Sequence, residues 1–216
     1  MGAVSLAATA TSTFAQASAA AASATPPPVA PVANPCPRLA PGSVIHQPAA
    51  LFSQNGVLYV QFSYQTTTDF AGRTLYCFMT PSGMENPRLH VNPGDTLNIT
   101  VTNNTPAGGL MMTLDPPNCG PGGNQMTMSS LNIHYHGTNT SPTCHSDEVI
   151  KTVINSGQTF QYGVTFPTNE PPGLYWYHPH VHGIAEAAVR GGGSGAIVVE
   201  VCKTSSRPSQ VCVTAF

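Results

Sequence analysis

Two short segments of this sequence carry histidines at alternate positions. The first reads His-Tyr-His-Gly at residues 134–137, and the second reads Trp-Tyr-His-Pro-His at residues 176–180. On a β-strand, side chains two residues apart point to the same face, roughly 6.5–7 Å from one another. Each segment therefore predicts a strand that presents two imidazoles on one side, and the fold must bring the two strands together if the four rings are to converge.

The candidate metal ligands are His134, His136, His178 and His180. Imidazole binds copper, zinc, iron and nickel, so the ligand type alone leaves the metal open. Four imidazoles packed together without a metal would leave several ring nitrogens poorly satisfied, at a cost of about 1–3 kcal/mol each. We therefore predict a metal site.

Three further histidines are expected to have other roles. His182 continues the alternation, but Gly183 follows it and the strand is expected to turn there, so we expect His182 at the rim of the site rather than among the direct ligands. His46 and His90 have no partner at a useful spacing and are expected to be ordinary hydrogen-bonded residues.

Short runs of alternating apolar and polar residues recur along the chain, with 20 Gly and 21 Pro to separate them. Seven or more short strands with turns between them predict an all-β fold, an antiparallel Greek-key β-sandwich. We expect residues 148–154 to form one of the strands, residues 103–128 to form a loop, and residues 185–189 to form a helical turn beside the histidines.

Charge and cysteine content narrow the function classes. Only 7% of the residues are charged and the formal net charge is −2, which gives no basic patch for nucleic acid. No run of eighteen apolar residues is present, so neither a transmembrane helix nor a membrane partner is expected. The six cysteines include no paired C-x-x-C motif and favour an oxidising compartment.

Composition divides the chain into three segments. Residues 1–38 are rich in Ala, Ser and Thr and then in Pro, and we interpret them as an export-signal remnant and a Pro-rich linker. The alternative is a tail of no targeting value. Residues 39–200 carry the strands and both histidine motifs, and residues 201–216 have no strand pattern and are hypothesised to arise from a frameshift. This division predicts a secreted or periplasmic protein.

If the two cysteines in the tail carry no structural meaning, the other four allow three disulfide pairings. Our preferred bridge is Cys119–Cys144, which would tie the Gly- and Pro-rich loop to the loop after His136. The remaining pair is then Cys36–Cys77.

The two histidine segments resemble the His-x-His motifs of multicopper oxidases, the family of laccases and ascorbate oxidases. Residues 89–102 are similar to the strand that opens the first cupredoxin domain of those enzymes, and residues 191–199 to the strand that closes it. The resemblance covers residues 40–200 and implies a cupredoxin-like fold.

Members of that family pass single electrons from a small reducing substrate, through a type 1 copper, to a trinuclear copper cluster that reduces O₂ to water. The resemblance implies that His134 binds the type 2 copper, that His136 and His178 share one type 3 copper, and that His180 binds the other. It also implies that Asp147 assists proton delivery to O₂. The alternative for Asp147 is an ordinary loop aspartate.

The sequence departs from the family pattern at the electron-entry site. A type 1 copper needs a Cys thiolate, two His and usually an axial Met. Cys144-His145 is the only Cys-His neighbour pair, no Met follows Met128, and no His follows His182. We therefore expect half of the cluster's ligands, and a truncated chain that is inactive alone and needs further cupredoxin domains or another subunit. The alternatives are a non-enzymatic copper- or zinc-binding module and a domain that completes its cluster by oligomerising.

Overall fold

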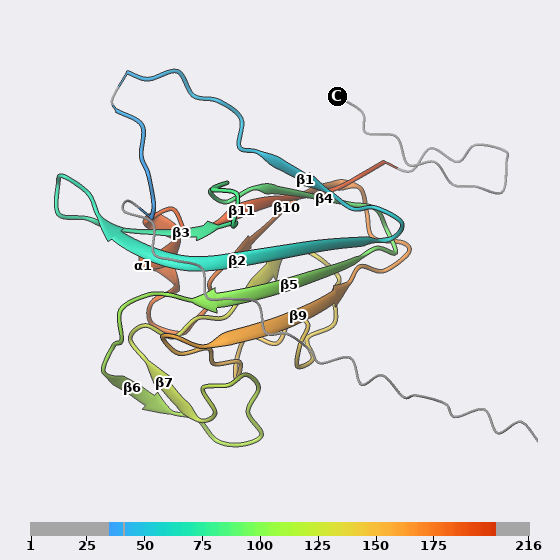
Figure 1. The fold of residues 1–216 in the computed structure, drawn as a ribbon. Helices are drawn as coiled ribbons and strands as arrows, with labels where there is room; N and C mark the ends of the chain where they lie inside the picture. The colour runs from blue at the N-terminus through green and yellow to red at the C-terminus, as the bar shows by residue number, and fades with distance from the viewer. Residues whose placement is uncertain (1–34, 41, 202–216) are drawn as a thin grey trace, which may run out of the picture.

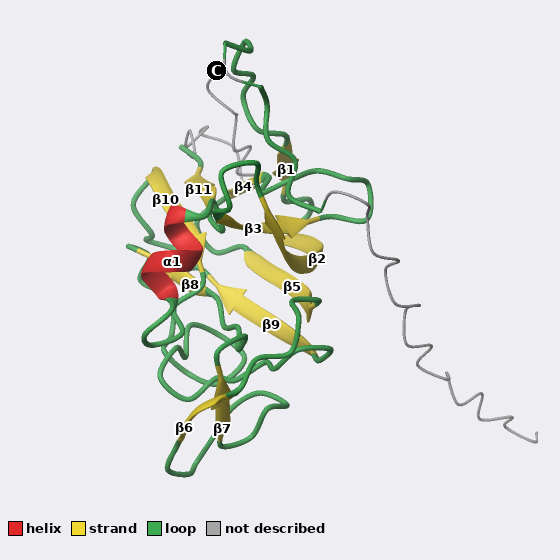
Figure 2. Cartoon of the chain, turned by 90° about the vertical axis from the view of Figure 1, so that its left-hand side faces the viewer, coloured by secondary structure: helices red, strands yellow, loops and turns green. Residues whose placement is uncertain are grey.

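The computed structural model describes residues 35–40 and 42–201, which form two packed β-sheets, a small hairpin and one helix (Figure 1). Figure 2 shows the two sheets as layers, with the helix beside the end of one of them. The five-stranded sheet has the order β1 (Ala50–Phe52), β4 (Arg88–Val91), β11 (Gly195–Val199), β10 (Gly173–His178) and β8 (His134–His136). The four-stranded sheet has the order β3 (Thr74–Met79), β2 (Val57–Thr68), β5 (Thr96–Asn103) and β9 (Thr159–Thr165).

The prediction of an all-β sandwich is confirmed. Within it the sheets are mixed: β1–β4, β4–β11 and β2–β5 pair in parallel, and the other neighbours pair antiparallel. The helix α1 (Ala185–Arg190) lies where the helical turn was expected, directly after the histidine segment.

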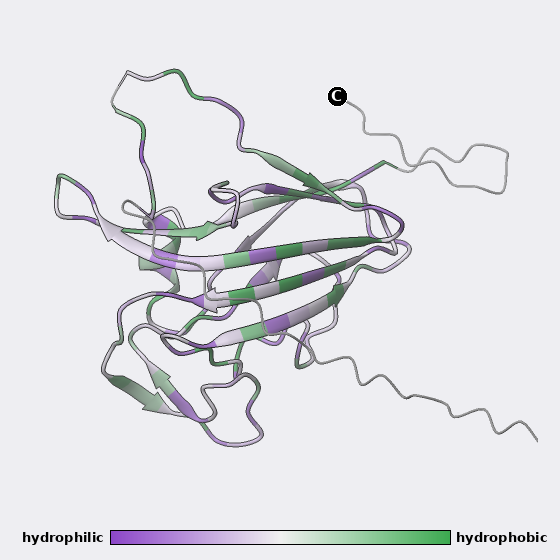
Figure 3. Ribbon diagram, in the orientation of Figure 1, coloured by the Kyte–Doolittle hydropathy of each residue, from purple (hydrophilic) through white to green (hydrophobic). Residues whose placement is uncertain are grey.

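The core lies between the two sheets, as the period-two patterns require. Along β5 the side chains of Leu97, Ile99 and Val101 are buried while the residues between them are partly exposed. Figure 3 shows this alternation as bands of opposite hydropathy on β2, β5 and β9. The opposite sheet contributes Tyr177, which is fully buried and stacks on Phe62 with 5.6 Å between ring centroids.

Two of the expected segments differ from the prediction. Residues 148–154 form only isolated bridges, at Thr152 and Ile154, instead of a strand. The reason is local: the carboxylate of Glu148 accepts hydrogen bonds from the backbone N–H groups of Ile150 and Lys151, both at 2.9 Å, and so bends the chain into a turn. The expected loop at 103–128 contains a two-stranded hairpin of β6 (Leu110–Thr113) and β7 (Gln125–Thr127).

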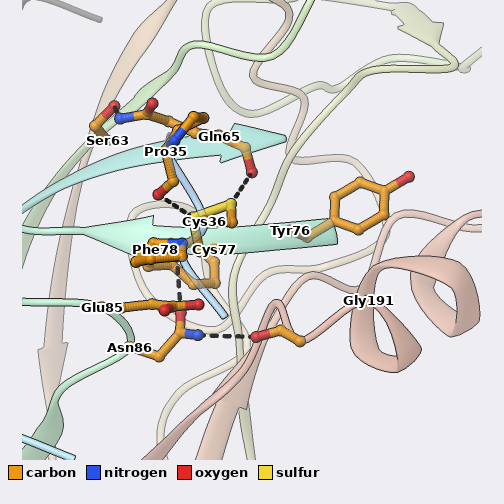
Figure 4. Close-up of a disulfide and its surroundings, with 12 residues drawn as sticks. Pro35, Cys36, Ser63, Gln65, Tyr76, Cys77, Phe78, Glu85, Asn86 and Gly191 are labelled. Atoms are coloured by element: carbon orange, nitrogen blue, oxygen red, sulfur yellow. Dashed lines mark hydrogen bonds between the residues drawn. A yellow bond between two sulfur atoms is a disulfide. The ribbon is translucent and has the colours of Figure 1, made fainter. Parts of the chain in front are cut away.

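Both predicted disulfides are present. Cys36–Cys77 fastens the segment before β1 to strand β3, beside Pro35 and Gln65 (Figure 4). Cys119–Cys144 joins the loop before β7 to the loop after β8. The predictions for residues 1–34 and for the tail from 202 onward lie outside the described residues. No helix within 35–40 and 42–201 is long and apolar enough to cross a membrane.

Candidate metal centre

The two histidine segments lie side by side, as predicted, but strand β10 ends at His178, so His180 follows the strand instead of lying on it. Strands β8 and β10 pair antiparallel, with His134 opposite His178 and His136 opposite Trp176. The tyrosines between the histidines, Tyr135 and Tyr177, point the other way and are fully buried. Alternation along both strands therefore places the tyrosines in the core and the imidazoles on the outer face of the five-stranded sheet.

All four candidate ligands gather at one place. The ligand atoms of His134, His136 and His178 lie within 4.8 Å of one another. The ring of His134 is also close to that of His180, with 5.1 Å between centroids. His178 is buried, His134 is half-buried, and His136 and His180 are exposed, so the group opens toward solvent.

Hydrogen bonds orient two of these rings. The Nδ1 of His134 lies 2.9 Å from the Oδ1 of Asp147, which also accepts the backbone N–H of Tyr135 at 3.0 Å. The Nδ1 of His178 lies 2.9 Å from the carbonyl oxygen of Pro179 and so acts as the donor. Because a carboxylate and a carbonyl both accept, each ring carries its proton on Nδ1 and keeps the Nε2 lone pair for a metal. The donor set and its tautomers therefore fit a metal ion that prefers imidazole.

Burial keeps His178 in the form that binds metal. Removal from water lowers the pKa of His178 from 6.5 to about 4. The hydrogen bond to the carbonyl of Pro179 opposes this in part, and the charges of the neighbouring imidazoles add a smaller lowering. Its ring also stacks on Trp176 with 4.0 Å between centroids. At neutral pH the ring is an uncharged imidazole held in one orientation.

The sequence reasoning missed Asn132. This residue is fully buried, its Oδ1 accepts the backbone N–H of His180 at 2.8 Å, and its Nδ2 donates to the carbonyl of Val149 at 2.9 Å. It therefore ties the end of the second motif to the strand of the first. A signal existed, because Asn132 precedes His134 by two residues and shares its position in the alternation.

The other histidines lie outside the cluster. His182 is exposed and precedes Gly183, whose φ of +84° marks the expected turn. His90 is buried and its Nδ1 lies 2.6 Å from Glu200, as expected for a hydrogen-bonded structural residue, and His46 is exposed. The sulfur of Cys144 is bonded to Cys119, so the Cys-His pair at 144–145 offers no thiolate.

The fold is that of a cupredoxin-like domain, and its paired histidine strands fit a metal ion. Residues 123–203 match the family model described as multicopper oxidase, which confirms the resemblance inferred from the motifs. Among curated proteins, none matches this sequence.

Solved structures support the fold. The multicopper oxidase McoA from the hyperthermophile Aquifex aeolicus is 21% identical with a TM-score of 0.50, and the match covers 73% of this chain and 30% of that one. Its 2F4 variant is 20% identical with the same TM-score, over 73% of this chain and 29% of that one. The chain thus spans less than a third of the length of these proteins. The family match over residues 123–203 and the shared fold make this chain similar to a cupredoxin-type domain of multicopper oxidases.

Proposed function

We propose that this chain is the first cupredoxin domain of a multicopper oxidase and supplies half of the ligands of a trinuclear copper cluster. Copper bound there would supply the chemistry by which multicopper oxidases reduce O₂ to water with electrons from a small reducing substrate. The observation that carries the proposal is the convergence of four imidazoles, three from the paired strands β8 and β10 and the fourth from His180 directly after β10. The four histidines of this chain would hold the copper in position.

Each residue has a proposed part. His134 would hold the type 2 copper, His136 and His178 would share one type 3 copper, and His180 would hold the other. Asp147 is proposed to fix the tautomer of His134 and to hold a proton near the site, because its carboxylate is half-buried and hydrogen-bonded to that ring.

The exposure of His136 and His180 supports the need for a second half. Each copper would receive one or two ligands from this chain, too few for the closed coordination that tight binding requires. We propose that further cupredoxin domains complete the cluster and that the 216-residue chain is inactive alone. Export to the periplasm or the exterior is proposed as well, on the support of two disulfides.

A copper titration with sedimentation analysis tests this proposal. We expect the purified chain to stay monomeric, to bind less than a full cluster of copper, and to leave a phenolic dye unoxidised. His134→Ala and His178→Ala should lose copper binding, while the matched control His46→Ala, an exposed histidine away from the cluster, should keep it. Copper binding that survives both cluster variants would refute the proposed ligands.

The two alternatives predict different results in the same experiment. A domain that completes its cluster by oligomerising would bind three coppers per interface and sediment as an oligomer in copper. A non-enzymatic module would bind copper or zinc as a monomer, and fusion or mixing with the remaining cupredoxin domains of such an oxidase would restore no O₂ consumption.

A further inference from the structure

A groove runs along the outer face of the five-stranded sheet, beside the histidine cluster. The small side chains of Ala196 and Val198 on β11 form its floor, because Ile197 between them points into the core. Trp176 and Leu174 stand on β10 opposite these two residues and form one wall. The groove has a volume of about 890 Å³, which falls in the range of small-molecule sites.

The opposite wall carries a positive charge. Arg88 lies at the start of β4, on the other side of β11, so the two walls stand two strand spacings or about 9.6 Å apart. Its Nε donates to the carbonyl oxygen of Pro48 at 3.1 Å, which holds the guanidinium at the groove edge. The terminal amino groups are left for another acceptor.

This guanidinium differs from the others in the described part of the chain. Arg38, Arg73 and Arg190 each pair with a carboxylate there, whereas Arg88 forms no such ion pair. Glu85 also lines the groove, but its carboxylate is bound by Arg38. The groove therefore combines an apolar floor, an aromatic wall and one uncompensated cation.

We propose that this groove binds a planar aromatic carboxylate. The ring would lie over Ala196 and Val198 against the indole of Trp176, and its carboxylate would receive the two terminal amino groups of Arg88. Aromatic faces favour planar apolar rings, and a guanidinium favours the bidentate geometry of a carboxylate. The proposed binding does not require copper, so its test is independent of the proposed oxidase function.

The only Trp of the chain provides the reporter. We expect 2-naphthoate, added to the ¹⁵N-labelled full chain in a chelator, to shift the single indole N–H resonance saturably. The neutral 2-naphthamide should bind about tenfold more weakly, because a hydrogen bond to an ionised group is lost. Cyclohexanecarboxylate, which keeps the charge but not the plane, should also bind more weakly.

Two variants test the site by calorimetry. Arg88→Gln should weaken 2-naphthoate about tenfold and leave 2-naphthamide unchanged. Ala196→Leu should fill the floor and weaken both ligands, and Arg73→Gln, an exposed arginine elsewhere, serves as the matched control. The proposal is overturned if the acid and the amide bind equally, if Arg88→Gln behaves like the control, or if no saturable shift of the indole occurs.

Discussion

At the scale of single residues, Asp147 links the backbone of β8 to the orientation of a candidate ligand. One oxygen accepts from both the N–H of Tyr135 and the Nδ1 of His134. We expect Asp147→Asn to lower Cu(II) affinity roughly 10- to 100-fold, because partners that orient ligating histidines typically carry that much affinity. Competition with a chelator measures this affinity.

The control for this variant is Asp115→Asn, at an exposed aspartate of the loop between β6 and β7. It removes the same charge from a side chain that, within the described residues, forms no hydrogen bond or ion pair with the four histidines, and it should leave the affinity unchanged. An equal loss of copper affinity in both variants would mean that Asp147 acts only through the net charge of the protein.

The buried ring of His178 makes the stability of the metal-free protein depend on pH. Burial, aided by the neighbouring imidazoles, lowers the pKa of His178 from 6.5 to about 4 in the folded state. Between these values the unfolded chain binds a proton that the folded chain does not, so stability decreases as the pH falls from 6.5 toward 4. Urea unfolding in a chelator at pH 7 and pH 4.5 measures the loss.

His178→Gln, which does not titrate, should show a smaller difference between the two pH values. The comparison is made within each protein, so a uniform destabilisation by the substitution cancels. An undiminished difference in the variant would assign the pH dependence to other groups.

At the scale of the elements, the side chain of Glu148 stabilises the turn that directly follows Asp147. Its carboxylate accepts from the N–H groups of Ile150 and Lys151 and from the hydroxyl of Thr152 at 2.6 Å. We expect Glu148→Ala to reduce the free energy of unfolding by about 1–3 kcal/mol, because backbone donors lose their acceptor. Glu148→Gln should lose less, since its amide oxygen still accepts.

The comparison is urea unfolding against Glu186→Ala, a substitution at an exposed helix position whose ion pair with Arg190 lies in water. Exposed ion pairs of this kind contribute less than about 1 kcal/mol. Equal effects of the two alanine variants would contradict the structural role of the Glu148 turn.

The segment at residues 148–154 also shows what the sequence pattern could not predict. Alternation shows which side chains of a strand share a face, and it therefore predicted that His134 and His136 lie on one side of their strand. It could not show that a glutamate side chain would replace the strand partners of residues 148–154. Contacts between segments far apart depend on tertiary placement: the alternation gives the face on which Asn132 lies, but it does not give His180 as its partner.

At the scale of the whole molecule, the histidine cluster is separate from the core. β8 is an edge strand of its sheet, and the imidazoles lie on the outer face, whereas the core fills the space between the two sheets. One disulfide ties Cys36, before β1, to strand β3, and the other joins the loop before β7 to the loop after β8. A domain built in this way does not need a metal to bury its apolar residues.

We therefore expect the chain to remain folded in a chelator and to gain stability from copper only by mass action. At free Cu(II) a hundredfold above the dissociation constant the gain is about 2.7 kcal/mol, and it should grow with the logarithm of the copper concentration. Thermal unfolding followed by circular dichroism measures both values, with His134→Ala as the variant that should lose the gain. If the chelator alone unfolded the chain, the metal would be structural, as in zinc fingers. That result would contradict the proposal of an open half-site that another domain completes.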